Sequence, residues 1–519
     1  MAVMIAFAIA MTLSIGAVPK VFAAGGQGNI TINGTSEGKT IDVYQIFSAT
    51  KSADNKVSYK LNTAYEGYFT ENVTSCNGKT GDALSEAAYA YVSALDKSTG
   101  NETEHVAFAK SILNWTLTTT NKPTAVDTLT VGAGATSVTT KALDYGYYLV
   151  YPKGAGDTTG AGTKSPAVLV NLTQDAITIN LKSAYPTVDK KVGDTDYTDA
   201  SIGDMVTYTL TSHVPDMTGY SAYTFKFLDT LSKGLTFGQI TSVKVGNDTL
   251  AAGTTGKTYA VTNTSDAGAG TTALTVTLND FYNQYKNQVG DAIVVTYTAT
   301  VNTDAVIGIN GNTNKAQVEY SNDPSDASKT DKTPEDEVPV YTFDFTINKF
   351  YMNNDTETAL AGVGFKLYSD EACNTEILLH KVEGKDVYQK AADNGVEIIT
   401  PASGKAQVTG LDAGTYYLKE TTTPDGYNKL LGPVKLVITP TYDANKLTSY
   451  KVTATYNGAN VDSVVNTAGT SPEVKIENKT GAELPNTGGR GIFYLTIAGV
   501  LVLAVTITGS VVSKKRKQN

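Results

Sequence analysis

The residue types that carry out most enzyme chemistry are scarce in this chain. Its 519 residues include only three histidines and two cysteines, all far apart: His105, His213, His380, Cys76 and Cys373. There is no CxxC or HExxH motif, so a zinc site or a Cys–His nucleophile has too few groups to be built from. We therefore expect no metal ion, no cofactor and no conventional enzyme activity.

The C-terminal end carries a motif with three consecutive parts. Its first part consists of Leu484, Pro485, Asn486, Thr487 and Gly488. An uncharged stretch over 491–513 and a basic tail follow. A stretch of this length can cross ~30 Å of hydrocarbon as a helix, and the tail would stay on the cytoplasmic side. An ordinary single-span membrane protein with a chance LPNTG is the alternative interpretation.

This tripartite order resembles the sorting signal of Gram-positive surface proteins. The resemblance implies that a sortase attacks the Thr487 carbonyl, releases Gly488 onward and passes the acyl group to an amine. At the other end, residues 1–24 are apolar, end in small residues and are predicted to be a cleaved signal peptide.

The charge balance also limits the possible partners. The two removed ends hold six of the 41 basic residues and none of the 51 acidic ones. The mature chain would then carry 35 basic residues and a net charge of −16. Nucleic-acid binding requires clustered Lys and Arg, so we expect a secreted acidic protein that binds no nucleic acid.

Between the ends, the pattern favours β-sheet. Thr-, Tyr- and Val-rich runs with alternating apolar residues recur, as in Met205–Leu210 and Ile293–Val301. Several short strands per domain, separated by turns, predict an all-β fold of tandem immunoglobulin-like sandwiches. Gly81–Ala94 and Glu104–Leu113 are better helices, so the first domain is expected to carry small helical insertions.

Pro-containing joints divide the chain into domains. A polar, acidic and Pro-bearing segment separates the second domain from the third and is predicted to be a linker. The predicted bounds are 1–24 for the signal peptide, 25–182, 183–322 and 341–483 for the three domains, 323–340 for the linker, and 484–519 for the sorting signal.

Two of these domains resemble known modules. The third is similar to a CnaB-type domain in Thr346–Lys349, Tyr416–Thr421 and Val474–Lys479. The second resembles the second domain of sortase-assembled major pilins, from Pro186–Val192 to Asn314–Ala316. Together with the sorting signal, the chain resembles the backbone pilins of the SpaA type, whose sandwiches are of CnaA and CnaB type.

The resemblance implies a structural shaft subunit of a covalent pilus on the wall of a Gram-positive bacterium, serving adhesion and colonisation. The implied partners are a sortase, other copies of the chain, minor pilins, peptidoglycan and a host surface ligand. The alternative is a monomeric wall-anchored adhesin that binds a host matrix ligand.

In such pilins a lysine and an asparagine of one domain condense with loss of ammonia, beside a catalytic acid. Burial favours the neutral amine and the protonated acid that this reaction needs. For the third domain the resemblance implies Lys349, Asn478 and the acid Glu420. An ordinary surface ion pair between Lys349 and Glu420 is the alternative. Such a bond forms once, so it is self-modification and not enzyme activity.

For the second domain the resemblance implies Lys190, Asn314 and the acid Asp229. Asn322, at the end of the same strand, is the alternative partner. In the first domain the position that corresponds to Glu420 holds Tyr151, which cannot act as that acid. No bond of this type is therefore expected there.

The amine that receives Thr487 of a neighbouring subunit is expected at the end of the first domain. Lys182 lies at the joint before the second domain, and this position favours it. Lys153, in Tyr151-Pro152-Lys153, matches the family's sequence context better and is the second candidate.

Overall fold

The computed structural model describes residues 26–95, 103–156, 166–181, 184–324, 326, 328–461, 465–466 and 470–481. The predicted signal peptide, Lys182, the LPNTG motif and the span 491–513 lie outside these residues. Within the described part of the chain, no helix is long and apolar enough to cross a membrane. The chain forms two compact units, which divide after Tyr341, except that 307–309 belong to the second unit.

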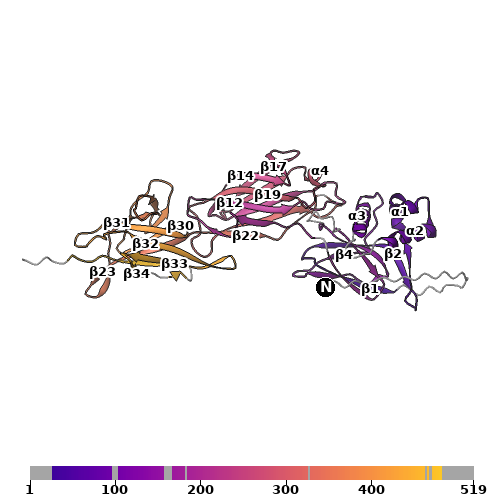
Figure 1. The fold of residues 1–519 in the computed structure, drawn as a ribbon, viewed down its shortest axis with the longest axis horizontal. Coiled ribbons are helices and arrows are strands. Elements are labelled where there is room, and N and C mark those ends of the chain that lie inside the picture. Colours follow the sequence, from indigo (N-terminus) through magenta and orange to yellow (C-terminus); the bar gives the residue numbers. More distant parts are fainter. Residues whose placement is uncertain are drawn as a thin grey trace, which may run out of the picture. The chain divides into compact units, whose positions relative to one another are not determined.

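The first domain, in the first unit, is built from two sheets and a group of helices (Figure 1). One sheet has the order β5-β1-β6 with β9 also paired to β1, and the other has the order β3-β2-β7-β8 with β4 paired to β2. Its strands are β1 (Gln27–Asn33), β2 (Thr40–Lys51), β3 (Val57–Leu61), β4 (Asp127–Thr130), β5 (Ser137–Thr139), β6 (Leu143–Asp144), β7 (Gly146–Pro152), β8 (Val168–Leu172) and β9 (Ala176–Asn180).

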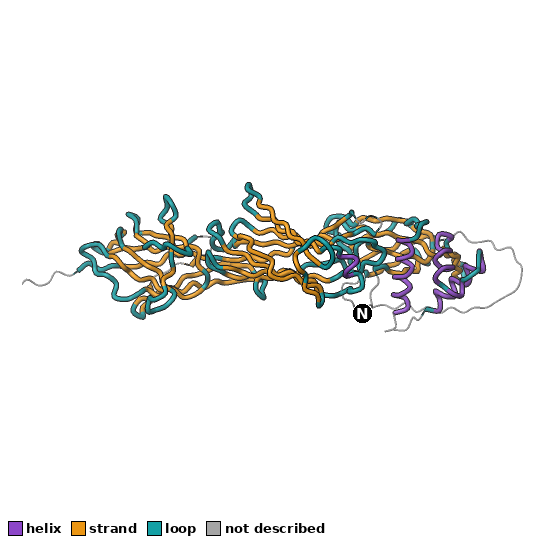
Figure 2. Tube along the Cα trace, turned by 90° about the horizontal axis from the view of Figure 1, so that it is seen from above, coloured by secondary structure: helices purple, strands orange, loops and turns teal. Residues whose placement is uncertain are grey.

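The helices of this domain confirm the predicted insertions. They are α1 (Glu66–Asn72), α2 (Gly81–Ala94) and α3 (Thr103–Thr118), with short 3-10 turns at Thr63–Tyr65 and Thr74–Cys76. Figure 2 shows these helices in purple, gathered in one part of the chain. Strand β7 supplies two cores because its residues alternate between faces: Tyr148 and Val150 pack between the sheets, while Leu149 and Tyr151 pack toward the helices.

The second domain, also in the first unit, is a two-sheet sandwich. Its sheets have the orders β10-β12-β19-β14-β15 and β11-β22-β20-β13-β18-β17-β16, with β21 paired to β20. The elements are β10 (Asp189–Val192), β11 (Thr198–Asp199), β12 (Met205–His213), β13 (Phe225–Leu231), β14 (Leu235–Val245), β15 (Asp248–Thr249), β16 (Ala251–Ala252), β17 (Thr258–Ser265), β18 (Thr272–Leu278), α4 (Phe281–Tyr285), β19 (Ala292–Val301), β20 (Asn312–Ser321), β21 (Thr330–Lys332) and β22 (Asp336–Tyr341).

The predicted linker 323–340 is wrong. Strand β22 lies between β11 and β20 in the second sheet, with Asn312 opposite Val340. Val338 and Val340 alternate with acidic residues and Pro339 and are fully buried. The polar residues that suggested a linker lie on the other face of this strand, so the second domain extends to Tyr341.

The third domain, in the second unit, is another two-sheet sandwich. One sheet has the order β24-β23-β30-β28-β27 with β36 paired to β23, and the other has β26-β25-β31-β32-β33-β34, with β29 paired to β25 and β35 to β33. The strands are β23 (Phe343–Asn353), β24 (Thr356–Ala359), β25 (Gly364–Tyr368), β26 (Glu376–Ile377), β27 (Leu379–Lys381), β28 (Val387–Lys390), β29 (Ile398–Ile399), β30 (Lys405–Leu411), β31 (Gly414–Thr422), β32 (Val434–Asp443), β33 (Lys446–Tyr456), β34 (Ala459–Val461), β35 (Val465–Asn466) and β36 (Glu473–Glu477). The predicted tandem sandwiches are thereby confirmed.

Candidate functional site

In the third domain, the first and last strands lie side by side and bring a lysine to an asparagine. Strands β23 and β36 are parallel neighbours, with Lys349 opposite Ile476. Val474 and Ile476 are buried, and Asn478 continues this inward-facing series just beyond the end of β36. Glu420 comes from β31 in the opposite sheet. The three side chains thus meet inside the sandwich.

These groups form a chain of hydrogen bonds. Lys349 Nζ donates to Asn478 Oδ1 and, at 3.1 Å, to the backbone oxygen of Ile476. Asn478 Nδ2 donates to Glu420 Oε1 at 2.7 Å. The exposed fractions of Lys349, Glu420 and Asn478 are 0%, 1% and 1%. The alternative of a surface ion pair between Lys349 and Glu420 is therefore wrong.

The surroundings of this site favour its reactive protonation state. Burial lowers the pKa of Lys349 to about 8, although the carboxylates of Glu420 and Glu477 oppose the shift. Glu420 Oε2 is buried and has no hydrogen-bond partner among the described residues. An acid beside the amide nitrogen is well placed to give a proton to a departing ammonia.

In the second domain, the corresponding groups lie on facing sheets. Lys190 is on β10, whereas Asp229 and Asn314 are on β13 and β20 of the other sheet. Their exposed fractions are 0%, 3% and 0%. Lys190 Nζ forms an ion pair with Asp229 Oδ2 and lies 4.9 Å from the ring centroid of Tyr208.

Tyr297 on β19 connects all three groups, and the sequence analysis missed it. Its hydroxyl accepts from Lys190 Nζ at 2.9 Å and from Asn314 Nδ2 at 2.6 Å, and donates to Asp229 Oδ2 at 2.9 Å. The alternation in Ile293–Val301 marks Tyr297 as inward-facing, but no local pattern tells which groups it faces. Asp229 Oδ1 and Asn314 Oδ1 are buried without a hydrogen-bond partner in the described part of the chain.

Burial shifts the ionisation of this pair in opposite directions. It lowers the pKa of Lys190 and raises the pKa of Asp229, and in each case the attraction between the two charges opposes the shift. Both shifts favour a neutral amine beside a protonated acid. The arrangement can therefore present a nucleophile, an amide carbon and a proton donor in one buried cluster.

The remaining predicted residues lie elsewhere. Asn322 is in the loop after β20 and lines a different cavity, of about 240 Å³, together with Lys153. Lys153 Nζ lies 3.1 Å from Asp42 and 3.7 Å from Asp323, and its side chain is 24% exposed. Lys182 falls outside the described residues, as does the LPNTG motif.

The first domain shows no such set among its described residues. Tyr151 is buried, and burial raises the pKa of its hydroxyl well above the ordinary value. The buried lysine there, Lys39, contacts the Tyr320 hydroxyl at 2.8 Å and Asp331, both from the second domain. Among the described residues, no hydrogen bond joins Lys39 to an asparagine.

Comparisons with known proteins match three consecutive parts of the chain. Residues 202–324 match the family described as Gram-positive pilin backbone subunit 2, Cna-B-like domain. Residues 343–454 match a prealbumin-like fold domain, and residues 476–519 match the LPXTG cell wall anchor motif.

A curated relative and two solved structures are also similar. The trypsin-resistant surface T6 protein of Streptococcus pyogenes is 27% identical over 264 residues, which cover 48% of this chain and 44% of that protein. The solved T6 backbone pilin of serotype M6 Streptococcus pyogenes is 18% identical, with a TM-score of 0.47, and the match covers 89% of this chain and 100% of that one. The solved major pilin SpaA of Corynebacterium diphtheriae is 16% identical, with a TM-score of 0.45, and covers 87% of this chain and 100% of its own.

The three matched families fall in the order that the sequence predicted, with the pilin domain second, the prealbumin-like domain third and the anchor motif last. The anchor motif marks a protein attached to the Gram-positive cell wall. The chain therefore carries, in this order, a Gram-positive pilin backbone domain, a prealbumin-like domain and an LPXTG cell wall anchor motif.

Proposed function

We propose that this protein is the repeating shaft subunit of a covalent cell-surface pilus, and that its second and third domains each close an internal isopeptide bond. The observation that carries the proposal is the recurrence of a fully buried lysine, asparagine and acid in both domains. A charged lysine is costly to bury, and an isopeptide bond would remove its charge.

The bond would form by one balanced step in each domain. The neutral lysine Nζ attacks the asparagine Cγ, and the bond from Cγ to Nδ2 breaks. The acid gives its proton to the departing nitrogen and takes one from the attacking amine, so ammonia leaves and the acid is restored. The proposed bonds are Lys190–Asn314, assisted by Asp229, and Lys349–Asn478, assisted by Glu420.

The same proposal accounts for where the bonds lie. A sortase would join Thr487 of one subunit to Lys182 of the next, with Lys153 as the second candidate acceptor. The covalent path from Lys182 to Thr487 passes along the chain through the second and third domains and leaves the first domain outside. Cross-links in those two domains would carry tension around each fold instead of through its hydrogen bonds.

The remaining partners follow from this assembly. The sortase and other copies of the chain are required by the polymer, and peptidoglycan by the anchor motif. Minor pilins and a host surface ligand complete the proposed set. A monomeric adhesin with the same anchor is the competing function, and it needs no acceptor lysine.

The test is an immunoblot of cell-wall extracts from cells that express the chain with its sortase. A shaft subunit gives a ladder of high-mass bands, and Lys182→Arg should reduce it to a single band while secretion is unchanged. Lys153→Arg is the matched control, and loss of the ladder in that variant alone would reassign the acceptor. A single band from the unmodified chain would favour the adhesin.

A further inference from the structure

Three consecutive threonines follow the acid of the third-domain site, and the reaction proposed above gives them no role. They are Thr421, Thr422 and Thr423. The hydroxyls of the first two donate to Glu397 Oε1, that of Thr422 at 3.3 Å. The hydroxyl of Thr423 donates to Glu420 Oε1. Thr423 therefore differs from its two neighbours, because its hydroxyl contacts the acid of the site.

The same carboxyl oxygen accepts a second hydrogen bond. Asn478 Nδ2 donates to Glu420 Oε1 at 2.7 Å, whereas Glu420 Oε2 is buried without a hydrogen-bond partner among the described residues. The terminal torsion of a glutamate has no sharp preference of its own, so a carboxyl group with a single contact can turn. A second donor on the same oxygen restricts that rotation. The two donors together fix which oxygen faces the amide nitrogen of Asn478.

Two features limit the freedom of Thr423 itself. Pro424 follows it directly, and a residue before proline is restricted to extended backbone. Further along the loop, the ring of Tyr427 contacts that of Tyr351, with ring centroids 5.1 Å apart. Tyr351 is on β23, the strand that carries Lys349. The loop is therefore tied to the strand of the attacking lysine.

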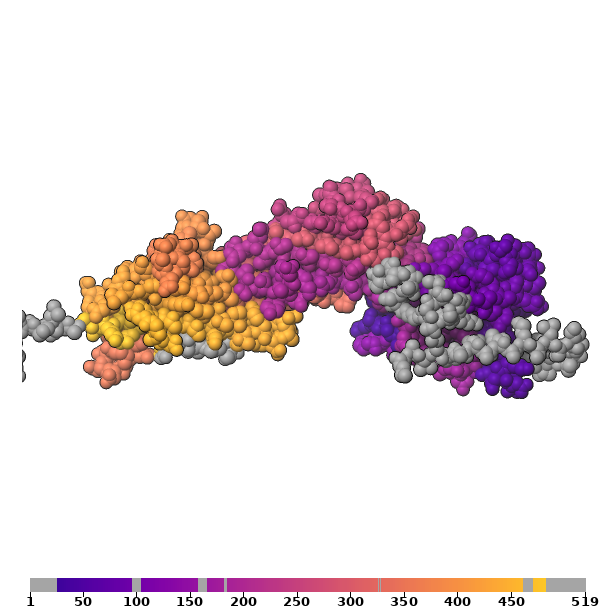
Figure 3. Space-filling model, viewed as in Figure 1, coloured from indigo at the N-terminus to yellow at the C-terminus, as the bar shows by residue number. Residues whose placement is uncertain are grey.

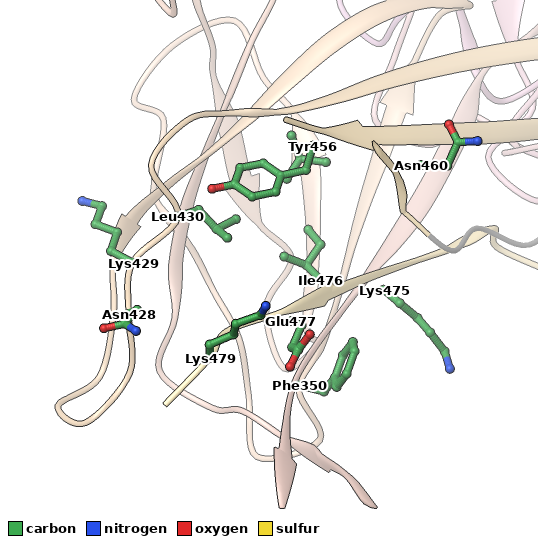
Figure 4. Close-up of a pocket in the computed structure, with 11 residues that line it drawn as sticks. Phe350, Asn428, Lys429, Leu430, Tyr456, Asn460, Lys475, Ile476, Glu477 and Lys479 are labelled. Carbon is green, nitrogen blue, oxygen red and sulfur yellow. The ribbon is translucent and has the colours of Figure 1, made fainter. Parts of the chain in front are cut away.

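The loop is also tied to the chain that carries the asparagine. Asn428 N–H donates to the backbone oxygen of Lys479 at 2.8 Å, and Lys479 directly follows Asn478. Figure 4 shows Asn428 and Lys479 on these two neighbouring segments. The last described residues, in yellow in Figure 3, lie on the surface of the domain, yet Asn478 is only 1% exposed. These contacts hold the loop, and with it Thr423, against the buried site.

The second-domain site also has a hydroxyl on its acid. The Tyr297 hydroxyl donates to Asp229 Oδ2 at 2.9 Å and accepts from Asn314 Nδ2 at 2.6 Å. In both sites the acid thus accepts a hydrogen bond from a hydroxyl, although the two hydroxyls belong to different residue types. This recurrence favours a role in the reaction over a contact that serves only the local fold.

We propose that Thr423 is a positioning residue for the third-domain reaction, and that its hydroxyl holds Glu420 Oε1 beside the amide nitrogen of Asn478. This inference rests on the proposed function, because it requires that Lys349 and Asn478 condense. Thr423 gains and loses no proton, since Glu420 gives its proton to the departing nitrogen and takes one from the amine. Reacting groups must be held within about 0.5 Å of the productive geometry, so loss of this hydrogen bond should slow the reaction without changing its product.

The test follows the third-domain bond in the full chain made by cell-free synthesis. Samples taken at increasing times are digested, and mass spectrometry measures the fraction of peptide in which Lys349 is joined to Asn478. Thr423→Val replaces the hydroxyl with a methyl group and should form the bond at least about 10-fold more slowly, the scale of one hydrogen bond to a charged group. Thr423→Ser restores the hydroxyl and should recover most of the rate. Thr422→Val is the matched control and should leave the rate unchanged.

A purely structural role is tested separately. The chain with both Thr423→Val and Asn478→Ala cannot form the bond, so its circular dichroism shows whether loss of the hydroxyl unfolds the domain. Rates are compared at temperatures at which this chain is fully folded, where a merely structural role would leave them equal.

Three results would contradict a proposal. An unchanged rate in Thr423→Val would refute the positioning role and leave the isopeptide bond standing. A slow rate that Thr423→Ser does not recover would assign the effect to packing of the side chain and would also refute the role of the hydroxyl. Absence of the joined peptide from the unmodified chain would refute the proposed bond itself.

Discussion

At the scale of single residues, Lys349 in the third domain lies in an environment that disfavours its charged ammonium form. Lys349 is fully buried, it donates to Asn478, whose amide in turn donates to Glu420, and burial lowers its pKa to about 8. A lysine held in this way costs stability as long as it remains an amine. Conversion to an amide removes the cost, which gives the proposed reaction part of its driving force.

This environment predicts a pH dependence when the bond cannot form. In Asn478→Ala, burial is expected to keep the folded pKa of Lys349 below the ordinary value of 10.5, as it does in the unmodified chain. Between pH 8 and 10.5 the unfolded chain therefore binds a proton that the folded chain does not, so stability rises with pH. Chemical denaturation across this range should show a gain of about 3 kcal/mol relative to the Lys349→Met, Asn478→Ala double variant. Equal slopes for the two proteins would contradict the assignment.

The second-domain site predicts a role for the hydroxyl of Tyr297. Tyr297→Phe keeps the ring that stacks on Tyr208 at 5.3 Å but removes the contacts to Lys190, Asp229 and Asn314. We expect this variant to lose ammonia from the second domain at least about 10-fold more slowly than the unmodified chain, because one contact that assists proton transfer is missing. Intact-mass measurements at increasing times after synthesis would show the difference in rate. Tyr285→Phe is the control, because that buried hydroxyl has no partner among the described residues.

At the scale of elements, the two proposed bonds would close their folds differently. Lys349 is on β23, and Asn478 directly follows the parallel neighbour β36, so their bond would tie the first strand to the end of the last. Lys190 and Asn314 come from facing sheets, so theirs would hold the sandwich halves together. In both cases the acid comes from a sheet that faces the lysine.

Each bond should stabilise the unit that contains it. A cross-link that closes a loop of more than 100 residues adds roughly 4–5 kcal/mol, so Asn314→Ala and Asn478→Ala should each lower one melting transition by roughly 10–20 °C. Calorimetry should place the two losses in different transitions, because the residues lie in different compact units. Asn322→Ala should leave both transitions unchanged; if it alone removes the bond of the second domain, Asn322 is the partner.

At the scale of the whole molecule, the number of bonds is a prediction. The described residues of the first domain hold no buried lysine–asparagine–acid set, and its buried lysine, Lys39, contacts Tyr320 and Asp331 of the second domain. Intact-mass measurement of the mature chain should therefore show the loss of two ammonia molecules. A loss of three, or a cross-linked peptide from 25–182, would contradict the argument that the bonds follow the covalent path from Lys182 to Thr487.

The anchor motif predicts where a shortened chain goes. Removal of 484–519 deletes the sequence that a sortase would cleave and the stretch that would hold the chain in the membrane meanwhile. The truncated protein should be found in the culture medium by immunoblotting, at a level comparable to that of the intact protein in the wall. Its retention at the wall would mean that another segment attaches it.

The sequence by itself determined the features that are encoded in short, continuous stretches of the chain. The LPNTG motif, the two helical insertions and the strand alternation in Met205–Leu210 can each be identified within a few residues, because a motif, a helix face and a strand face repeat locally. The resemblance added Lys349, Asn478 and Glu420, which the structure brings together.

Other features depended on the tertiary structure. The segment with Val338 and Val340 was a strand and not a linker, since only the sheet beside it shows which face is buried. The position of Asn314 beside Tyr297, and of Asn322 in another cavity, depends on which strands face each other across the sandwich. That pairing is set by tertiary packing between strands of different sheets, and no local pattern encodes it.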